Sequence, residues 1–453
     1  MKKSTLIIVF ILAGMYGCQQ KESVRIQNTQ ENIILKKHKK KHIELTQGDQ
    51  DKFHLKSKIE SVRKTQLTTF GRLLTPPPVR TPDDNAANDA LNQKNLPQVH
   101  VMNFNTHGNN ISSYPFDYEN DITTLKKLYR DHNLDQIIRN DMIELDKLTV
   151  LMVYTHDFLQ GGRKPTPEEK WKITSPSAIT ITNLRRNESI GGTSEHYAAL
   201  FCQLALSCGY NSRLVSMHTF DDNGEFLRND VCEIYLNNFR KWAVFDVYNR
   251  ATYYLREGIP LSALELRQYM LEDRYREIVT KSGIGDFADI SSVREKLLPR
   301  YEFIYMWRMN DILSKSDRKK IFPWQALYKF HLVWEDEYTP ISDGGFDRLD
   351  IFTNSANADY ILDGVRYITH KKQDFNWDIN NVEINVSRTG IETGKMYFDT
   401  ITPNFDHFLI YVDGVPEVIQ NIYVQKKIFG DYQVRSINKL GVGGPVSSIS
   451  MIQ

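Results

Sequence analysis

Ser194 is the residue of this chain that is best placed to act as a nucleophile. Residues 194–208 have helical spacing, with Thr193 or Ser194 available as an N-terminal cap and Gly209 as the C-terminal stop. Small and apolar residues follow Ser194 at intervals of four and three, which places it on the inward face of the helix: Ala198, Phe201, Ala205 and Cys208. Because the N-terminus of a helix favours negative charge, a fold can hold a nucleophile there.

Short strands are predicted to follow this helix and to hold the other polar candidates. The apolar patterns indicate strands at residues 211–217, 231–236 and 241–246, with turn signals between them. Asp246 ends the third strand, so the segment from Ser194 to Asp246 is predicted to be a buried helix that leads into a small antiparallel sheet.

The order of this helix and sheet resembles the transglutaminase-like core, a relative of the papain-type cysteine peptidases. The matching positions lie on the helix, at its end and on two strands: Tyr197-Ala198, Gly209 through Arg213, Glu233-Ile234-Tyr235, and Trp242 four residues before Asp246. Residues 258–266 also look like extensions found in bacterial members, and the resemblance covers roughly residues 120–270. It implies an α+β fold, with a transglutaminase-like (papain-like) core and helical extensions.

Active members of this family use a Cys–His–Asp triad, in which a thiolate attacks, an imidazole moves the proton and a carboxylate orients the imidazole. The resemblance places Ser194 at the position of the Cys, Asn229 at that of the His and Asp246 at that of the Asp. A serine hydroxyl needs a base, and an asparagine amide cannot accept and return a proton at neutral pH. The resemblance therefore implies a non-catalytic transglutaminase-like domain.

Other residues keep catalysis open as an alternative. His218, in the region between the first strand and its turn, is a candidate base, whereas His196 diverges from Ser194 by about 200° around a helix. Cys232 lies near Asn229 in the sequence and is a second candidate nucleophile. With Ser194 or Cys232 as nucleophile and His218 as base, the protein would be a hydrolase or acyl-transferase of the peptidase or amidase type.

No cofactor and no metal site are predicted. None of the 12 His belongs to an HExxH-type arrangement, and the sequence shows no glycine-rich phosphate-binding loop. The four Cys include no CxxC spacing, and Cys202 and Cys208 lie six residues apart on one helix, so they point in different directions. Together with Cys232 they are predicted to be small core residues.

Residues 1–17 are typical of a secretory signal peptide. Lys2 and Lys3 precede an apolar run over residues 6–13, which is shorter than the about 20 residues of a transmembrane helix. The ending at residues 15–18 resembles a bacterial lipoprotein box, which implies cleavage before Cys18 and a lipid on its sulfur. We therefore expect an exported protein that is anchored to a membrane of the bacterial cell envelope through Cys18.

Residues 18–95 are predicted to be a basic, proline-containing tether. Residues 19–75 hold 13 Lys+Arg against 6 Asp+Glu, and residues 36–42 are all Lys or His. Such a segment either follows anionic lipid headgroups or is a solvated spacer, and we favour the spacer. Because the whole chain carries a formal charge of only +1, the part from residue 76 onward is acidic, and the charge gives no support to nucleic-acid binding.

The next two regions are predicted to be a domain and an extension. Residues 96–270 form the transglutaminase-like domain, which begins with two or three helices within residues 122–155. Residues 271–375 form a mixed extension with helical segments near residues 291–298 and 301–313. The aromatic side chains of the extension are either core or the lining of a glycan-binding surface, and we favour core.

A C-terminal β-sandwich is predicted over residues 376–453. Apolar residues alternate along short strands, and turn signals at residues 389–390 and 413–414 separate them. Residues 432–445 are similar to the last two strands of a fibronectin type III-like (immunoglobulin-like) domain. Such modules usually act as spacers or docking surfaces.

The sequence favours a lipid-anchored protein whose non-catalytic domain binds an envelope glycan, peptide or protein partner in the groove near Ser194. The enzyme described above is one alternative. A structural assembly lipoprotein, with a groove filled by its own side chains, is another.

Overall fold

The structure is a computed structural model, and it describes thirteen stretches of the chain: residues 100–105, 110–164, 166, 177–220, 226–285, 288–289, 303–313, 331–334, 336, 367–390, 392–420, 422–425 and 429–452. The expected signal peptide, Cys18, the tether and much of the extension lie outside the described residues. The chain divides into two units, and one of them, Arg80–Thr219 with Leu227–Gln453, holds all elements below except two strand ends at Phe220 and Phe226.

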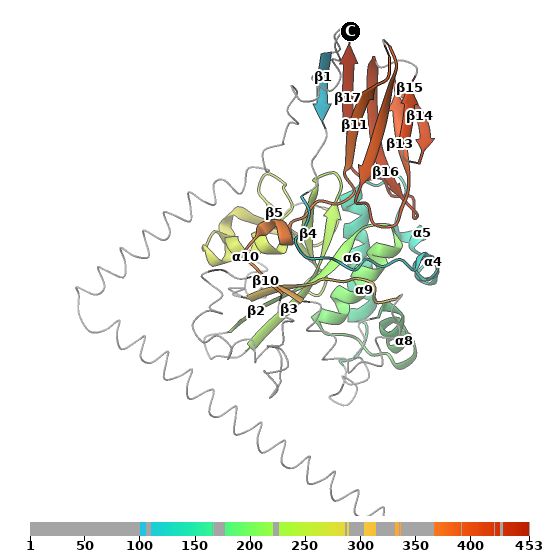
Figure 1. Cartoon of the computed structure of the whole chain (residues 1–453). Coiled ribbons are helices and arrows are strands. Elements are labelled where there is room, and N and C mark those ends of the chain that lie inside the picture. Colours follow the sequence, from blue (N-terminus) through green and yellow to red (C-terminus); the bar gives the residue numbers. More distant parts are fainter. Residues whose placement is uncertain are drawn as a thin grey trace, which may run out of the picture. The chain divides into compact units, whose positions relative to one another are not determined.

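A nine-stranded sheet forms the centre of this unit, in the order β10-β9-β8-β2-β3-β4-β5-β6-β7 (Figure 1). Its strands are β2 Ser212–Phe220, β3 Phe226–Leu236, β4 Lys241–Asp246, β5 Ala251–Leu255, β6 Ile278–Lys281, β7 Ala288–Asp289, β8 Phe303–Trp307, β9 His331–Trp334 and β10 Tyr367–Thr369. The β3–β4, β4–β5 and β5–β6 pairs are antiparallel, whereas β10 runs parallel to β9. The strands predicted before and after residue 237 are thus confirmed.

Helices accompany the sheet, and α9 is central among those that pack on one of its faces (Figure 1). They are α4 Ile122–Asp131, α5 Leu134–Ile137, α6 Glu144–Gln160, α8 Ala178–Glu188, α9 Ser194–Ser207, α10 Ala263–Leu271 and α15 Lys372–Phe375, with a 3-10 turn at Tyr275–Glu277. The helix predicted at residues 194–208 is therefore confirmed, as are the helices within residues 122–155. No helix of the described residues is long and apolar enough to cross a membrane.

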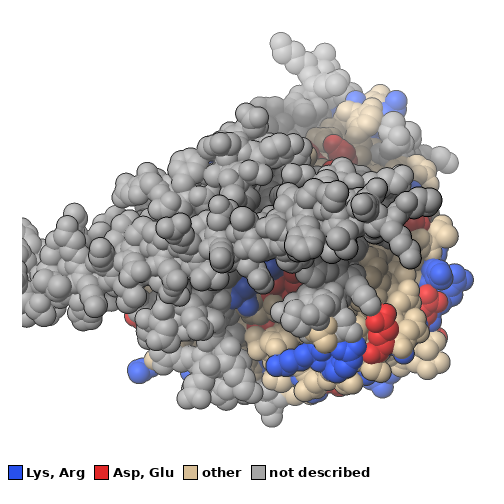
Figure 2. All heavy atoms as spheres, turned by 90° about the horizontal axis from the view of Figure 1, so that it is seen from below, with Lys and Arg blue, Asp and Glu red and all other residues tan. Residues whose placement is uncertain are grey.

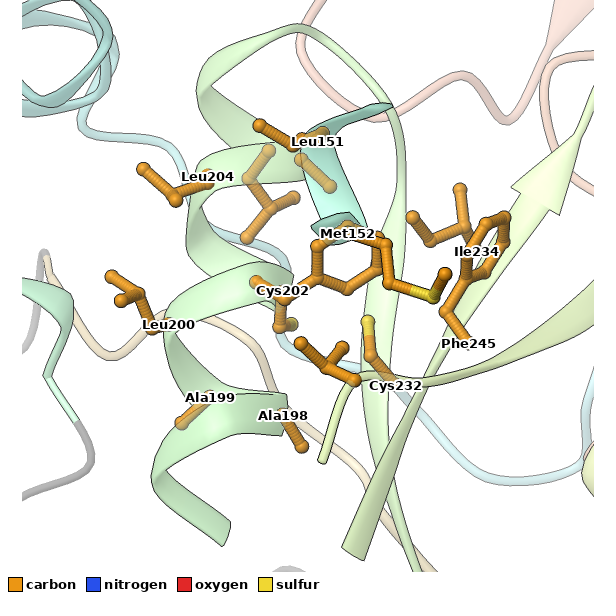
Figure 3. Packing of buried hydrophobic residues seen from close by; sticks show 14 of the residues in the cluster. Leu151, Met152, Ala198, Ala199, Leu200, Cys202, Leu204, Cys232, Ile234 and Phe245 are labelled. Carbon is orange, nitrogen blue, oxygen red and sulfur yellow. The ribbon is translucent and has the colours of Figure 1, made fainter. Parts of the chain in front are cut away.

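The main core lies between α9 and the strands. Figure 3 shows side chains of α6, α9, β3 and β4 meeting there, among them Leu151, Met152, Leu204, Ile234 and Phe245, all fully or almost fully buried. Burial of one such side chain is worth about 1.5–3 kcal/mol. Cys202 and Cys232 belong to this core, and they and Cys208 are free thiols, so the prediction of core cysteines is confirmed for the two buried ones.

His132, directly after α4, links three helices through its ring. Its Nδ1 lies 2.8 Å from the hydroxyl of Tyr154 on α6, and its Nε2 lies 3.0 Å from the hydroxyl of Thr182 on α8. Burial, and to a smaller extent the charge of Arg186, lower the pKa of the imidazole to about 4. The ring is therefore neutral at physiological pH and acts as a packed polar link between the helices.

The helix predicted near residues 301–313 is wrong where the structure describes this segment. Residues Phe303–Trp307 form strand β8, which pairs antiparallel with β2 from Val215 opposite Met306 to His218 opposite Phe303. A short, continuous apolar run does not distinguish a strand from a buried helix by periodicity. Both faces of β8 carry large apolar or aromatic residues, a composition that favours a central strand.

The C-terminal region has two sheets that enclose a second core, and a β-sandwich-like region is thus confirmed (Figure 1). One sheet has the order β1-β17-β16-β13-β14 and the other the order β11-β12-β15. The strands are β1 His100–Asn105, β11 Val382–Arg388, β12 Gly394–Thr400, β13 Phe405–Val412, β14 Val415–Ile419, β15 Ile422–Gln425, β16 Gly430–Asn438 and β17 Ser447–Ile452. Asp413 and Gly414 have φ of 48° and 85°, which suits the predicted two-residue hairpin turn.

Strand β1 is a member of this sandwich that the sequence did not indicate. We expected residues from 96 onward to belong to the helical domain, but β1 pairs antiparallel with β17, from His100 opposite Ile452 to Asn105 opposite Ser448. Strand pairing between distant segments leaves no local signal in either of them, so only the three-dimensional structure reveals it.

Polar contacts join the sandwich to the α9 core. The Asn438 amide donates to the Gly209 carbonyl oxygen at 2.8 Å, and the Asn211 and Asn380 side chains are 3.1 Å apart. Gly209 has φ of 88°, and a Cβ at this position would lie 2.5 Å from Val442 Cγ2. The predicted helix stop at Gly209 therefore also gives the sandwich room to approach the end of α9.

Candidate functional site

Ser194 is the first residue of α9, as expected, and its hydroxyl donates to a carboxylate. Ser194 Oγ lies 3.2 Å from Asp230 Oδ2 on β3. Thr193 caps the helix together with His196, because the Thr193 backbone N–H donates to His196 Nδ1 at 3.0 Å. This bond occupies the lone pair of Nδ1, so His196 serves the helix end.

Asp230 is held by two further groups. Arg228 Nε lies 2.8 Å from Asp230 Oδ2, and the Ser216 hydroxyl donates to Asp230 Oδ1. Arg228 also reaches Glu195 on α9, with 3.3 Å between Nη2 and Oε2. Ser194, Glu195, Ser216, Arg228 and Asp230 are called the α9 polar cluster below.

The charges of the α9 polar cluster support one another. Burial alone would lower the pKa of Arg228, but its interactions with Asp230, first, and with Tyr305 and Glu195 raise it above its usual value. Burial raises the pKa of Glu195, and the charge of Arg228 opposes that rise. The guanidinium is therefore permanently charged and provides a counterion to Asp230.

Asn229 and Asp246 are in contact, as expected for the positions of the His and Asp of the family. Asn229 Nδ2 donates to Asp246 Oδ2 at 2.9 Å. The same carboxylate accepts from the Tyr253 hydroxyl at 2.9 Å and from Asn249 Nδ2 at 2.8 Å. Asp246 is fully buried, and burial raises its pKa while these hydrogen bonds lower it. The lone pairs of the Asp246 carboxylate thus accept hydrogen bonds from neutral donors.

Ser194 and the Asn229–Asp246 pair lie on different sides of β3. Asp230 shares its face of the strand with Cys232 and Ile234, which pack in the α9 core. Asn229 is its neighbour in the chain and therefore shares the opposite face with Glu233. No hydrogen bond between Ser194 and Asn229 or Asp246 is found in the described part of the chain. The geometry thus contains two separate polar sets.

His218 and Cys232 are the residues that left catalysis open as an alternative. His218 lies on β2 opposite Phe303, two residues after Ser216, and its side chain lies outside the described part. Cys232 is fully buried, and burial raises the pKa of its thiol well above the usual value. A thiolate attacks far faster than a thiol, so this environment opposes nucleophilic attack by Cys232.

Arg228, Asp230 and Glu195 were not predicted as site residues from the sequence. Each is the immediate neighbour of a residue that the family resemblance pointed to, Asn229 or Ser194. The available signal was the alternation of β3, since a one-residue step along a strand changes the face. Arg228 and Asp230 flank Asn229 in the sequence. They indicate that the face of β3 opposite to Asn229 is also polar.

Three residues of the family resemblance meet in a separate buried cluster. Arg213 Nε donates to Glu233 Oε2 at 2.7 Å, and the guanidinium lies 4.0 Å from the ring centroid of Trp242. Glu233 Oε1 accepts from the Ala263 backbone N–H at 2.6 Å, at the first residue of α10. These residues connect β2, β3, β4 and α10, which is a structural role.

Within the described residues, no group of three or more His, Cys, Asp or Glu side chains is arranged to hold a metal ion. On the face drawn in Figure 2, Lys and Arg side chains lie beside Asp and Glu side chains. Comparison of the chain with protein-family models, with curated proteins and with solved structures found no match.

Proposed function

We propose that this chain is an exported, lipid-anchored protein whose transglutaminase-like domain is non-catalytic and binds an envelope peptide or glycan near Ser194. The observation that carries the proposal is the separation of Ser194, which donates to Asp230, from Asn229, which donates to Asp246 on the opposite face of β3. Where an active member of the family would have an imidazole, this protein has an amide that only donates to the carboxylate. An amide cannot move a proton between a nucleophile and a leaving group.

The surroundings of Ser194 support the same conclusion. Its hydroxyl donates to Asp230, whose charge is already compensated by Arg228. A carboxylate with a guanidinium counterion is a far weaker base than an imidazole, so it does not generate a serine alkoxide.

The order and contacts of the elements support the family resemblance. Helix α9 is followed by β2, β3 and β4 in the expected sequence, and Arg213, Glu233 and Trp242 meet in one cluster. A transglutaminase-like core accounts for this combination. The alternating strands and hairpin of the C-terminal region suit a fibronectin type III-like module in the same way.

The α9 polar cluster offers groups that suit a peptide or glycan. The side chains of Arg228 and Glu195 are 35% and 30% exposed, so both reach solvent beside Ser194. Together they present N–H donors and carboxylate acceptors at one place. Peptide amides and sugar hydroxyls are ligands that need both.

The decisive experiment is an activity assay on purified protein from residue 19 onward with peptide and glycopeptide amides. We expect no turnover by the wild type and none by Ser194→Ala. Ser387→Ala, which removes a partly exposed hydroxyl from the sandwich, is the matched control. Turnover that Ser194→Ala abolishes and Ser387→Ala preserves would show an enzyme and overturn the proposal.

Ligand binding is tested with the same proteins. We expect saturable binding of an envelope peptide or glycan fragment that Arg228→Gln weakens, because the α9 polar cluster loses its donor. Arg274→Gln is the control. Arg274 forms similar ion pairs, with Glu272 and Glu277, but it does not belong to the α9 polar cluster. Equal effects of the two substitutions would place the ligand elsewhere.

A further inference from the structure

A cavity of about 440 Å³ lies where the start of α6, the β3–β4 turn and the segment between β16 and β17 meet. Its lining comes from these three places, from β16 and from the residue after the α9 stop: Glu144, Lys147, Tyr210, Asn237, Asn238, Arg240, Arg435 and residues 441–446. The volume is in the range of small-molecule sites. Tyr210 follows the C-terminal end of α9, whereas Ser194 lies at its N-terminal end, so this cavity is independent of the function proposed above.

The lining carries more positive than negative charge. Lys147, Arg240 and Arg435 are cationic, and Glu144 is the carboxylate among the lining residues. Both oxygens of Glu144 are already used. Oε1 accepts from the Asn237 backbone and side chain at 3.0 and 2.9 Å, and Oε2 accepts from the Asn238 backbone at 3.0 Å. The carboxylate thus fixes the β3–β4 turn, and three cations against one carboxylate leave the lining with an excess of positive charge.

Arg435, one of the lining residues, carries a buried donor. Its Nε–H is buried and has no hydrogen-bond partner among the described residues. Folded proteins rarely leave such a donor unpaired without a functional reason. Gly443 lies beside it, since a Cβ at residue 443 would be 3.0 Å from Arg435 Cδ and 3.5 Å from Arg435 Nη1. The glycine therefore provides the space that the Arg435 side chain occupies.

Arg240 is held in an unusual backbone conformation at the same cavity. Its φ is 51°, a region that residues other than Gly, Asn and Asp rarely adopt. Its Nη2 donates to the Val446 carbonyl oxygen at 2.9 Å, which directs the guanidinium toward the β16–β17 segment. The backbone and one nitrogen of Arg240 are thus fixed at the edge of the cavity.

We propose that this cavity binds a small anionic group, a carboxylate or a phosphate, between Lys147, Arg240 and Arg435. Guanidinium groups form two parallel hydrogen bonds with the oxygens of such groups, and an ammonium adds a point charge. The ligand would contact both the α6 side and the sandwich, so it would also strengthen the junction between them.

The test is a calorimetric titration of the full chain in detergent, at low salt and pH 7, with inorganic phosphate and with N-acetylalanine as separate probes. We expect saturable binding of at least one probe, and the tighter one identifies the source of the anionic group. Arg435→Met and Lys147→Met should each weaken binding about tenfold or more. Lys439→Met, an exposed substitution of equal charge outside the lining, should leave it unchanged.

Two results would overturn the proposal. One is the absence of saturable binding for both probes, and the other is an equal loss of binding in Lys439→Met, which would indicate non-specific charge attraction. Thermal unfolding of each variant shows whether the fold is kept. Because Arg435→Met removes an unpaired buried donor, we expect the midpoint of its thermal unfolding to be unchanged or raised. If that midpoint falls instead, Lys147→Met provides the second test of binding.

Discussion

Arg213 on β2 and Glu233 on β3 form an ion pair whose side chains are 0% and 1% exposed. Burial lowers the pKa of the guanidinium, and the charge of Glu233 opposes this, so the pair is favourable only while both partners are present. Glu233 also receives the first backbone N–H of α10. The pair therefore connects the sheet to α10.

Removal of one partner should be costly. We expect Arg213→Met to lower the free energy of unfolding by about 3–5 kcal/mol, because it leaves the Glu233 charge buried without a counterion. Urea denaturation followed by circular dichroism measures this. Arg139→Met is the control, since Arg139 and Asp141 are 67% and 73% exposed and their pair contributes little. If Arg213→Met were as stable as Arg139→Met, the Glu233 charge would not be buried without a counterion, and the prediction would be wrong.

His132 should make stability sensitive to mild acid. Its pKa in the folded state is about 4, below the value of 6.5 for a free imidazole, so the unfolded chain binds a proton more readily. Stability is therefore present above pH 6.5 and is lost as the pH falls toward 4, by about 3 kcal/mol in total. In urea denaturation at pH 7 and pH 5, His132→Gln should lose less stability between the two values than the wild type. Equal losses would show that His132 does not contribute.

A thiol in place of Ser194 should stay unactivated. The N-terminus of α9 favours a thiolate, but the carboxylates of Asp230 and Glu195 oppose it. We expect Ser194→Cys to react with iodoacetamide with a half-maximal rate at about pH 8.5 or above. Addition of Asn229→His should not change this, because residue 229 lies on the other face of β3. A plateau of reactivity below pH 7 in the double variant would contradict that geometry.

Gly209 should be needed for the approach of the sandwich. We expect Gly209→Ala to lose about 1–2 kcal/mol through its positive φ, and more through the clash with Val442. Gly258→Ala is the matched control, because Gly258 has φ of 82° and no atom lies within 4 Å of the position that its Cβ would take. Thermal unfolding should give a larger loss for residue 209, part of which Val442→Ala recovers. Equal losses would mean that the junction tolerates the methyl group.

Membrane attachment should depend on Cys18. In cells labelled with radioactive palmitate, we expect the wild type to carry label and to sediment with membranes. Cys18→Ala should lose both properties, since acyl methylenes, each worth about 0.8 kcal/mol, are then no longer attached and buried in the membrane. Cys208→Ala should retain them. Labelled, membrane-bound Cys18→Ala would contradict the anchor.

The local elements of this fold could be predicted from the sequence. Helix α9 combines an N-terminal cap, a continuous apolar face and Gly209, and β4 was predicted with its observed bounds, residues 241–246. Strand β8 was missed because its apolar run suits either a strand or a buried helix. Strand β1 was missed because its partner, β17, is the last of the described strands along the chain.

The candidate site could be predicted only in part. The contact of Asn229 with Asp246 follows from the family resemblance, and it is observed. The contact of Ser194 with Asp230 does not follow from it, because a motif identifies positions but not the face of the strand that each one occupies. The Arg435 Nε–H is buried without a partner among the described residues, and this has no signature in the sequence.

The pairing of β1 with β17 sets the timing of folding. During synthesis the ribosome makes β1 long before β17, and the two are separated by all the other strands and helices described above. The edge of β1 therefore stays unpaired until β17 has been made. Closing the long stretch of chain between the two strands is slow. The α9 core can therefore assemble before the sandwich is complete, because β1 is secured only when β17 is available to pair with it.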